Sequence, residues 1–183
     1  MNMEKLFRDF EVQIKAERQK EIELDARELQ RAEYARIQHL DRLAAQLGQE
    51  LTVAVEGAQV YTGELQALGS GWIQMRSQTE NVLIPQHALV WWEGGSRFSS
   101  VDAGSVKRQL TLGYALRALS SARLPVRIFH TSDSLTTEGT IERVGLDFIE
   151  VAVHGIEGNF RSKHILGYRM LSVSQIGAVC SAL

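Results

Sequence analysis

The stretch Gly63-Glu64-Leu65-Gln66-Ala67-Leu68-Gly69-Ser70-Gly71-Trp72-Ile73-Gln74-Met75 decides how this chain is interpreted, because a related stretch follows it. The second stretch is Gly139-Thr140-Ile141-Glu142-Arg143-Val144-Gly145-Leu146-Asp147-Phe148-Ile149-Glu150-Val151, at a constant offset of 76 residues. Most glycine and apolar positions of the first stretch have an equivalent in the second. Recurrence of one supersecondary unit indicates two copies of a small β-structure. Neither stretch carries a catalytic set of side chains.

The sequence around each stretch alternates in the way that strands do. Residues 51–92 contain short apolar runs with period 2, separated by turn residues, which favours a small antiparallel unit. Pro85 should lie at a strand break or edge, because proline donates no hydrogen bond to a ladder. A helical pattern between Val106 and Leu119 precedes a second series of strands that runs from Val126 to Val179.

The N-terminal region reads as a long helix. It contains neither proline nor glycine before Gly48 and is rich in strong helix formers. Its apolar stripe lapses over residues 15–21, which argues against a sustained coiled coil. Two interpretations stay open: an arm that pairs with another chain, or a helix whose last turns pack on the first β-unit. The predicted self-association residues are Met3, Phe7, Phe10 and Ile14.

The composition of the chain bears on the cellular compartment in which the protein is expected. The chain has 183 residues, a formal net charge of −2 and a single cysteine, Cys180, which fits a reducing compartment. Residues 1–20 are polar and charged, without the apolar core of a signal peptide. No apolar run approaches the roughly 20 residues that cross a bilayer. The predicted location is cytoplasmic, without membrane contact.

The glycine-hinged hairpins, together with the segment Val82-Leu83-Ile84-Pro85-Gln86-His87-Ala88-Leu89-Val90, resemble the Sm-like fold. The resemblance covers residues 37–92 and 106–179. It also extends to uncharacterised actinobacterial proteins that carry a charged N-terminal helix and two such barrels. It implies an α+β, mainly β fold: a long N-terminal helix followed by two tandem Sm-like (SH3-like) small antiparallel barrels, each preceded by a helix. The implied segments are an arm at 1–36, a first barrel with its helix at 37–93, a linker at 94–105 and a second barrel with its helix at 106–183.

RNA-binding Sm proteins place an Asp and an Asn in the pocket that holds a base. The matching positions of this chain hold Gly69 and Ile73 in the first copy, and Gly145 and Ile149 in the second. The usual base pocket is therefore missing from both copies. Any RNA binding would need another surface, made of aromatic platforms beside cations.

Candidate residues for a surface that binds RNA or a partner follow from this requirement. Between residues 93 and 130 the chain has six basic and two acidic residues, in contrast to its acidic balance overall. If these cations form one basic face, RNA is favoured; if they are scattered or paired, a protein partner is favoured. The candidates are Trp91, Trp92, Arg97, Lys107, Arg108, Arg161 and Lys163.

The sequence carries no sign of an enzyme. The five histidines lack the spacing of a zinc site, no glycine-rich loop opens a helix, and no nucleophile elbow surrounds a serine. We expect no catalytic residue, metal or cofactor. The predicted function is a non-enzymatic protein-interaction and assembly module, a homo-oligomer that also docks a protein partner. The alternative is an RNA-binding regulator that uses the fold without the base pocket.

Overall fold

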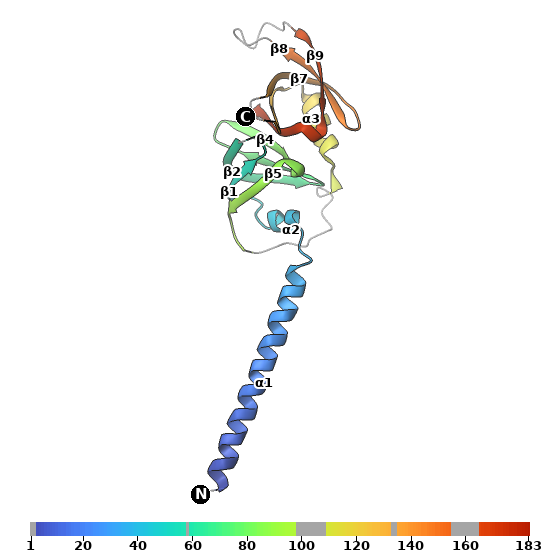
Figure 1. The fold of residues 1–183 in the computed structure, drawn as a ribbon. Helices are drawn as coiled ribbons and strands as arrows, with labels where there is room; N and C mark the ends of the chain where they lie inside the picture. Colours follow the sequence, from blue (N-terminus) through green and yellow to red (C-terminus); the bar gives the residue numbers. More distant parts are fainter. Residues whose placement is uncertain (1–2, 58, 98–108, 133–134, 155–164) are drawn as a thin grey trace. The chain divides into compact units, whose positions relative to one another are not determined.

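The two recurring stretches form two antiparallel hairpins (Figure 1). In the first, β2 (Gln59–Gly69) pairs with β3 (Trp72–Arg76); in the second, β7 (Thr136–Val144) pairs with β8 (Phe148–His154). Gly71 has φ +83°, a left-handed conformation that glycine adopts without strain, and it turns the first hairpin. Each hairpin has a register shift at the same relative place, after Leu65 and after Ile141.

The computed structural model describes residues 3–57, 59–97, 109–132, 135–154 and 165–183, with side chains from Val12 onward. The helices are α1 (Met3–Tyr34), α2 (His39–Ala44) and α3 (Leu112–Ala122), and two short 3₁₀ turns are η1 (Gln86–Ala88) and η3 (Val173–Gln175). The remaining strands are β1 (Glu50–Val55), β4 (Glu80–Pro85), β5 (Leu89–Gly94), β6 (Pro125–His130), β9 (Ile165–Ser172) and β10 (Ile176–Ala182).

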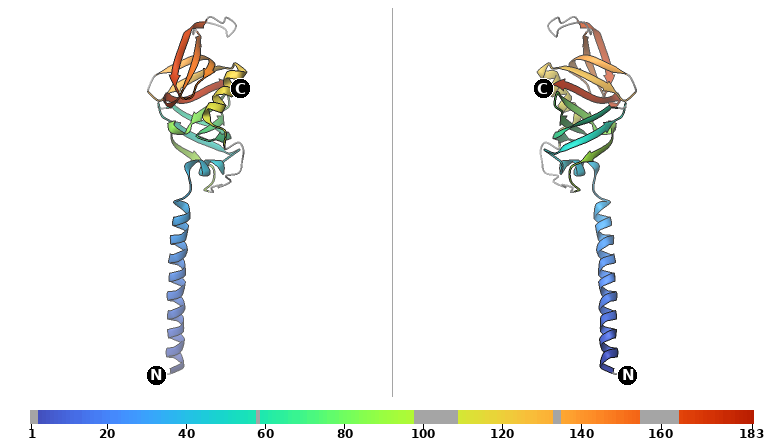
Figure 2. Two further views of the ribbon diagram at one scale, coloured as in Figure 1. Left: turned by 90° about the vertical axis from the view of Figure 1, so that its right-hand side faces the viewer. Right: turned by 90° about the vertical axis from the view of Figure 1, so that its left-hand side faces the viewer.

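The strands form one open, antiparallel ten-stranded sheet in the order β5-β1-β2-β3-β4-β10-β6-β7-β8-β9. We call β1 to β5 the first half of the sheet and β6 to β10 the second half. The halves join where β4 pairs with β10, with Val179 opposite Leu83 and Cys180 opposite Val82. Both views of Figure 2 show β10, in red, running between the strands of the two halves. The sheet ends at β5 on one side and at β9 on the other.

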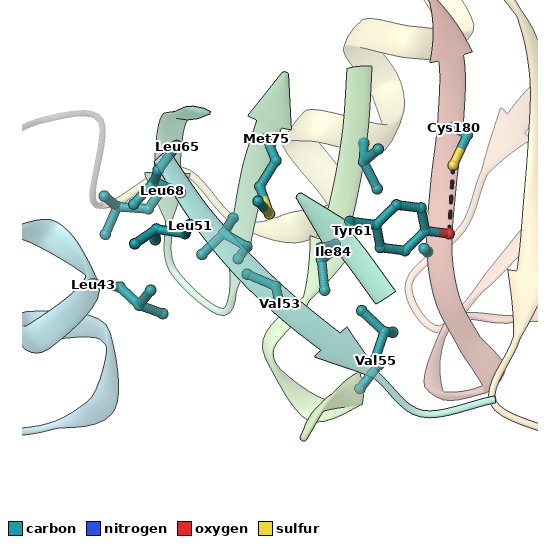
Figure 3. Packing of buried hydrophobic residues seen from close by; sticks show 14 residues of the cluster. Leu43, Leu51, Val53, Val55, Tyr61, Leu65, Leu68, Met75, Ile84 and Cys180 are labelled. Atoms are coloured by element: carbon teal, nitrogen blue, oxygen red, sulfur yellow. Dashed lines mark hydrogen bonds between the residues drawn. The ribbon is translucent and has the colours of Figure 1, made fainter. Parts of the chain in front are cut away.

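Each half is centred on one apolar core, and each core also takes in side chains of the other half, Ala178 and Cys180 in the first core and Trp72 and Leu83 in the second. The first core contains side chains from α2, β1 to β4 and β10, and Figure 3 shows Tyr61 reaching Cys180 of β10 within it. In the second core, Leu116 of α3 packs with side chains of β6 to β10, and α3 lies against β7. Burying one large side chain of this kind contributes about 1.5 to 3 kcal/mol. The largest fully buried apolar side chains are Leu43, Leu51, Leu65, Ile73, Met75, Ile84, Leu116, Ile128, Ile141, Ile149 and Ile176.

The prediction of two tandem Sm-like small barrels is wrong. The chain is mainly β, but its strands form a single ten-stranded sheet. The reason lies at β4, whose outer edge would be free in a separate barrel. Here β10 pairs with that edge, and Ala178 and Cys180 of β10 complete the first core. The first core therefore includes side chains from the last strand of the chain.

The chain divides into two compact units, Met1–His39 and Leu40–Leu183. The first unit holds α1, and the second holds the whole sheet with both cores. The side chains of α1 from Val12 to Tyr34 are all exposed within this structure. Among the described residues, no helix combines the length and the apolar character needed to cross a bilayer.

Candidate functional site

An apolar stripe lies on β9, at one end of the sheet. Leu166, Tyr168 and Met170 are 70%, 61% and 60% exposed. Alternate residues of a strand point to the same face, so these three side chains share one face of β9. Phe148 of the neighbouring β8 stands opposite Ser172 and is also exposed. Because β9 is an edge strand, apolar side chains occur here together with a backbone edge that no described strand pairs with.

The tryptophan pair lies on β5, at the other end of the sheet. Trp91 is 45% exposed. Trp92 packs partly buried against the first core, and the guanidinium of Arg42 lies 5.9 Å from its ring centroid. The same guanidinium donates a hydrogen bond to the carbonyl oxygen of Arg97. The strand therefore presents one of the two predicted aromatic platforms outward and uses the other for packing.

The predicted basic surface residues are described only in part. Lys107, Arg108, Arg161 and Lys163 lie outside the described residues. Arg97 is described and exposed. The structure describes only Trp91, Trp92 and Arg97 of this surface, so the surface as a whole stays a prediction.

The other cations between residues 93 and 130 are described. Arg127 forms an ion pair with Glu138 at 3.6 Å and lies over the ring of Phe129. Arg117 and Arg123 are exposed. Because one of these cations is paired with an acid and two others are not described, RNA binding stays a prediction.

The predicted self-association residues fall on α1. The side chains of Met3, Phe7 and Phe10 lie outside the described side chains, and Ile14 is exposed. Further along α1, Ile22, Leu24 and Leu29 are also exposed. An isolated helix gains little stability in water without a packed apolar face. Within its own unit, no described residue covers these apolar side chains of α1.

A polar cluster at the second half was missed by the sequence interpretation. Arg169 of β9 donates a hydrogen bond to the hydroxyl of Thr137 at 2.9 Å, and the same oxygen lies 3.0 Å from Nε2 of His130. Thr137 is buried, whereas Arg169 is exposed. Burial lowers the pKa of His130, and the charge of Arg169 lowers it further. Within the described part of the chain, no carboxylate forms an ion pair with Arg169.

The signal for this cluster was present in the recurring sequence. Thr137 follows Tyr61 by the constant offset, so a hydroxyl side chain replaces an aromatic one. Arg169 lies opposite Val151 and Val82 lies opposite Met75, which makes Arg169 the equivalent of Val82. A cationic residue at a position that is apolar in the other copy marks a place where the second half differs in surface chemistry.

Cys180 is the counterpart of this cluster in the first half. Its thiol donates a long hydrogen bond of 3.6 Å to the hydroxyl of Tyr61, and both side chains are buried. Burial raises the pKa of the Cys180 thiol to about 11, and it raises the pKa of Tyr61 above its usual range. A neutral, enclosed thiol is a poor nucleophile. Cys180 therefore serves packing at the junction between β4 and β10.

We expect stability to fall at alkaline pH through this thiol. The folded state holds the proton more tightly than the unfolded chain, so the stabilising contribution is complete below pH 9 and is lost towards pH 11. Urea unfolding across this range should show a decline that is shallower in Cys180→Ala. An equally steep decline in the variant would contradict this assignment.

Comparison with known proteins does not assign this chain to a family. No protein-family model matches the chain, and no curated protein matches it significantly. Among the described residues, no group of three or more histidine, cysteine or acidic side chains could hold a metal ion. The surfaces that the structure offers for function are the two ends of the sheet and the exposed face of α1.

Proposed function

We propose that this chain is a non-enzymatic protein-interaction and assembly module. The observation that carries the proposal is the stripe Leu166, Tyr168 and Met170 on an edge strand. Exposed apolar side chains in a contiguous row mark interaction sites on protein surfaces. An unpaired strand edge supplies the main-chain hydrogen bonds that an added strand would use. The stripe and the edge together suit a protein ligand in extended conformation.

Self-association through α1 is the second part of this proposal. The helix has 32 residues, and its apolar side chains from Ile14 to Leu29 are exposed. Pairing of two helices would cover these side chains and stabilise a segment that is marginal when alone. The helix then brings two copies together, and the sheet edges provide the docking surfaces.

We expect the weight-average mass in sedimentation velocity to rise with protein concentration above the 20.5 kDa of one chain. Substituting the helix stripe in Phe7→Glu/Ile14→Glu should shift the rise to higher concentrations, because the carboxylates would be desolvated in the pairing face. Gln13→Glu adds one charge beside Ile14 and serves as the control. A wild-type chain that stays at the mass of one chain at every concentration would contradict self-association.

A further inference from the structure

The two halves of the sheet have the same strand order and the same registers. The first half runs β5-β1-β2-β3-β4 and the second β10-β6-β7-β8-β9. Val53 stands opposite Trp92 in the first half, and Ile128 stands opposite Val179 in the second. Both pairings shift register by one residue at the same place. Strand β10 is therefore the equivalent of β5, and by the pairings of β3 and β8, β9 is the equivalent of β4.

The junction between the halves shows how these two kinds of strand fit together. On β4, Val82 lies in the first core and Leu83 packs into the second. On β10, Ala178 and Cys180 enter the first core, and Val179 enters the second. A β5-type strand thus closes the open edge of a β4-type strand, and side chains on both faces of the junction become buried.

The equivalent positions at the two ends of the sheet are uncovered. Met170 of β9 is 60% exposed where its equivalent Leu83 is 6% exposed. Trp91 of β5 is 45% exposed where its equivalent Ala178 is fully buried. Arg169 and Glu93 are exposed as well, in place of the buried Val82 and Cys180. Each chain therefore contains one closed junction between a β4-type strand and a β5-type strand. It also contains one more strand of each type, β9 and β5, which lie at opposite ends of the sheet.

Transferring the register of the closed junction makes the two free strands complementary in charge. Cys180 stands opposite Val82, so the same register places Glu93 opposite Arg169. Val179 stands opposite Leu83, so Trp92 would stand opposite Met170. An oppositely charged pair directly across two strands is stabilising, and a like-charged pair is destabilising. The free strands thus carry a pair of charges that matches only in this register.

The polar cluster of the second half lies where the incoming carboxylate would arrive. In the first half, the hydroxyl of Tyr61 meets the thiol of Cys180 from the added strand. The equivalent of Tyr61 is the shorter Thr137, which holds Arg169 by a hydrogen bond beside His130. In the second half, the shorter Thr137 replaces Tyr61 and the cationic Arg169 replaces Val82. These two changes suit an added strand that brings an acidic side chain where β10 brings a thiol.

We propose that a second copy of this chain adds its β5 strand antiparallel to β9, in the register of the β4–β10 junction, with Glu93 paired to Arg169. This inference rests on the proposed function, because it names the partner that the exposed edge accepts. The contact joins unlike surfaces, so each added copy leaves one β9 and one β5 free for the next. Trp91 becomes covered on the second half, as Ala178 is covered on the first.

Charge exchange between two variants tests this pairing. Arg169→Glu places two acids across the contact, and Glu93→Arg places two bases there. We expect each variant alone to associate at least about tenfold more weakly than the wild type in sedimentation velocity. An equimolar mixture of the two variants should recover wild-type association, because each strand then meets an opposite charge. Glu142 and Arg143 are exposed on β7, a strand that is paired on both sides. The control variants Arg143→Glu and Glu142→Arg make the same charge changes away from both edges of the sheet and should leave association unchanged.

The outcomes separate this inference from the proposed function. Circular dichroism and urea midpoints first establish that the variants fold as the wild type does. Unchanged association of both edge variants, with association still weakened in Phe7→Glu/Ile14→Glu, would overturn the edge pairing and leave helix-mediated assembly standing. Weakening without recovery in the mixture would overturn the pairing of Glu93 with Arg169. A wild-type chain that never associates would overturn both proposals.

Discussion

Gly139→Ala is expected to destabilise the protein by about 3 kcal/mol, because the added Cβ has no room at this point of the sheet. A Cβ built on Gly139 would overlap the carbonyl oxygen of Ala152 on β8 and lie 2.8 Å from Cγ1 of Val151. Backbone atoms of a paired strand cannot move aside without breaking the ladder. Urea unfolding of the purified variant measures the loss as a lower midpoint.

Gly167→Ala is the matched control for this substitution. Gly167 lies on β9 in the same half of the sheet, and a Cβ built there meets no atom within 4 Å. This control should be close to neutral, with a small gain from reduced freedom of the unfolded chain. Equal stability of Gly139→Ala and Gly167→Ala would contradict the close approach of β7 and β8 at Gly139.

Val82→Glu is expected to cost about 4 kcal/mol or more, since it buries a charge without a partner at the junction of the two halves. Val82 is fully buried in the first core, opposite Cys180 of β10. The carboxylate would enter an apolar environment, and the pairing of β4 with β10 would be disrupted. Chemical unfolding should show a much lower midpoint, together with access of a thiol reagent to Cys180.

Val60→Glu makes the same change on the exposed side of β2 and controls for the loss of a β-branched residue. Val60 is exposed in the structure, so its substitution should shift the unfolding midpoint only slightly. A loss below about 1 kcal/mol in Val82→Glu would show that the two halves do not depend on the β4–β10 junction.

The sequence allowed the two hairpins to be predicted, but it did not show which strand edges pair with each other. Glycine and apolar spacing indicate the two hairpins, which are present as β2–β3 and β7–β8. Period-2 alternation shows which side chains share a face of a strand but not which strand edges pair. The prediction of separate barrels failed for this reason, because the pairing of β4 with β10 joins segments that are far apart in the chain.

One sequence signal did distinguish the closed junction from the free edge. Val82, Leu83 and Ile84 are apolar in succession, which is typical of a strand that is buried on both faces. The equivalent Arg169, Met170 and Leu171 begin with a cationic side chain, as an accessible edge does. The polar cluster of His130, Thr137 and Arg169 was missed because its members lie on three strands and meet only after the sheet curls.

Hydrogen exchange followed by mass spectrometry, as a function of protein concentration, tests most directly whether copies assemble through the two free edges of the sheet. We expect backbone amides of β9 and β5 to become protected together as concentration rises, while protection of the interior strand β2 stays constant. Exchange in β9 and β5 that is unchanged at concentrations where sedimentation shows assembly would contradict pairing of copies through these two edges.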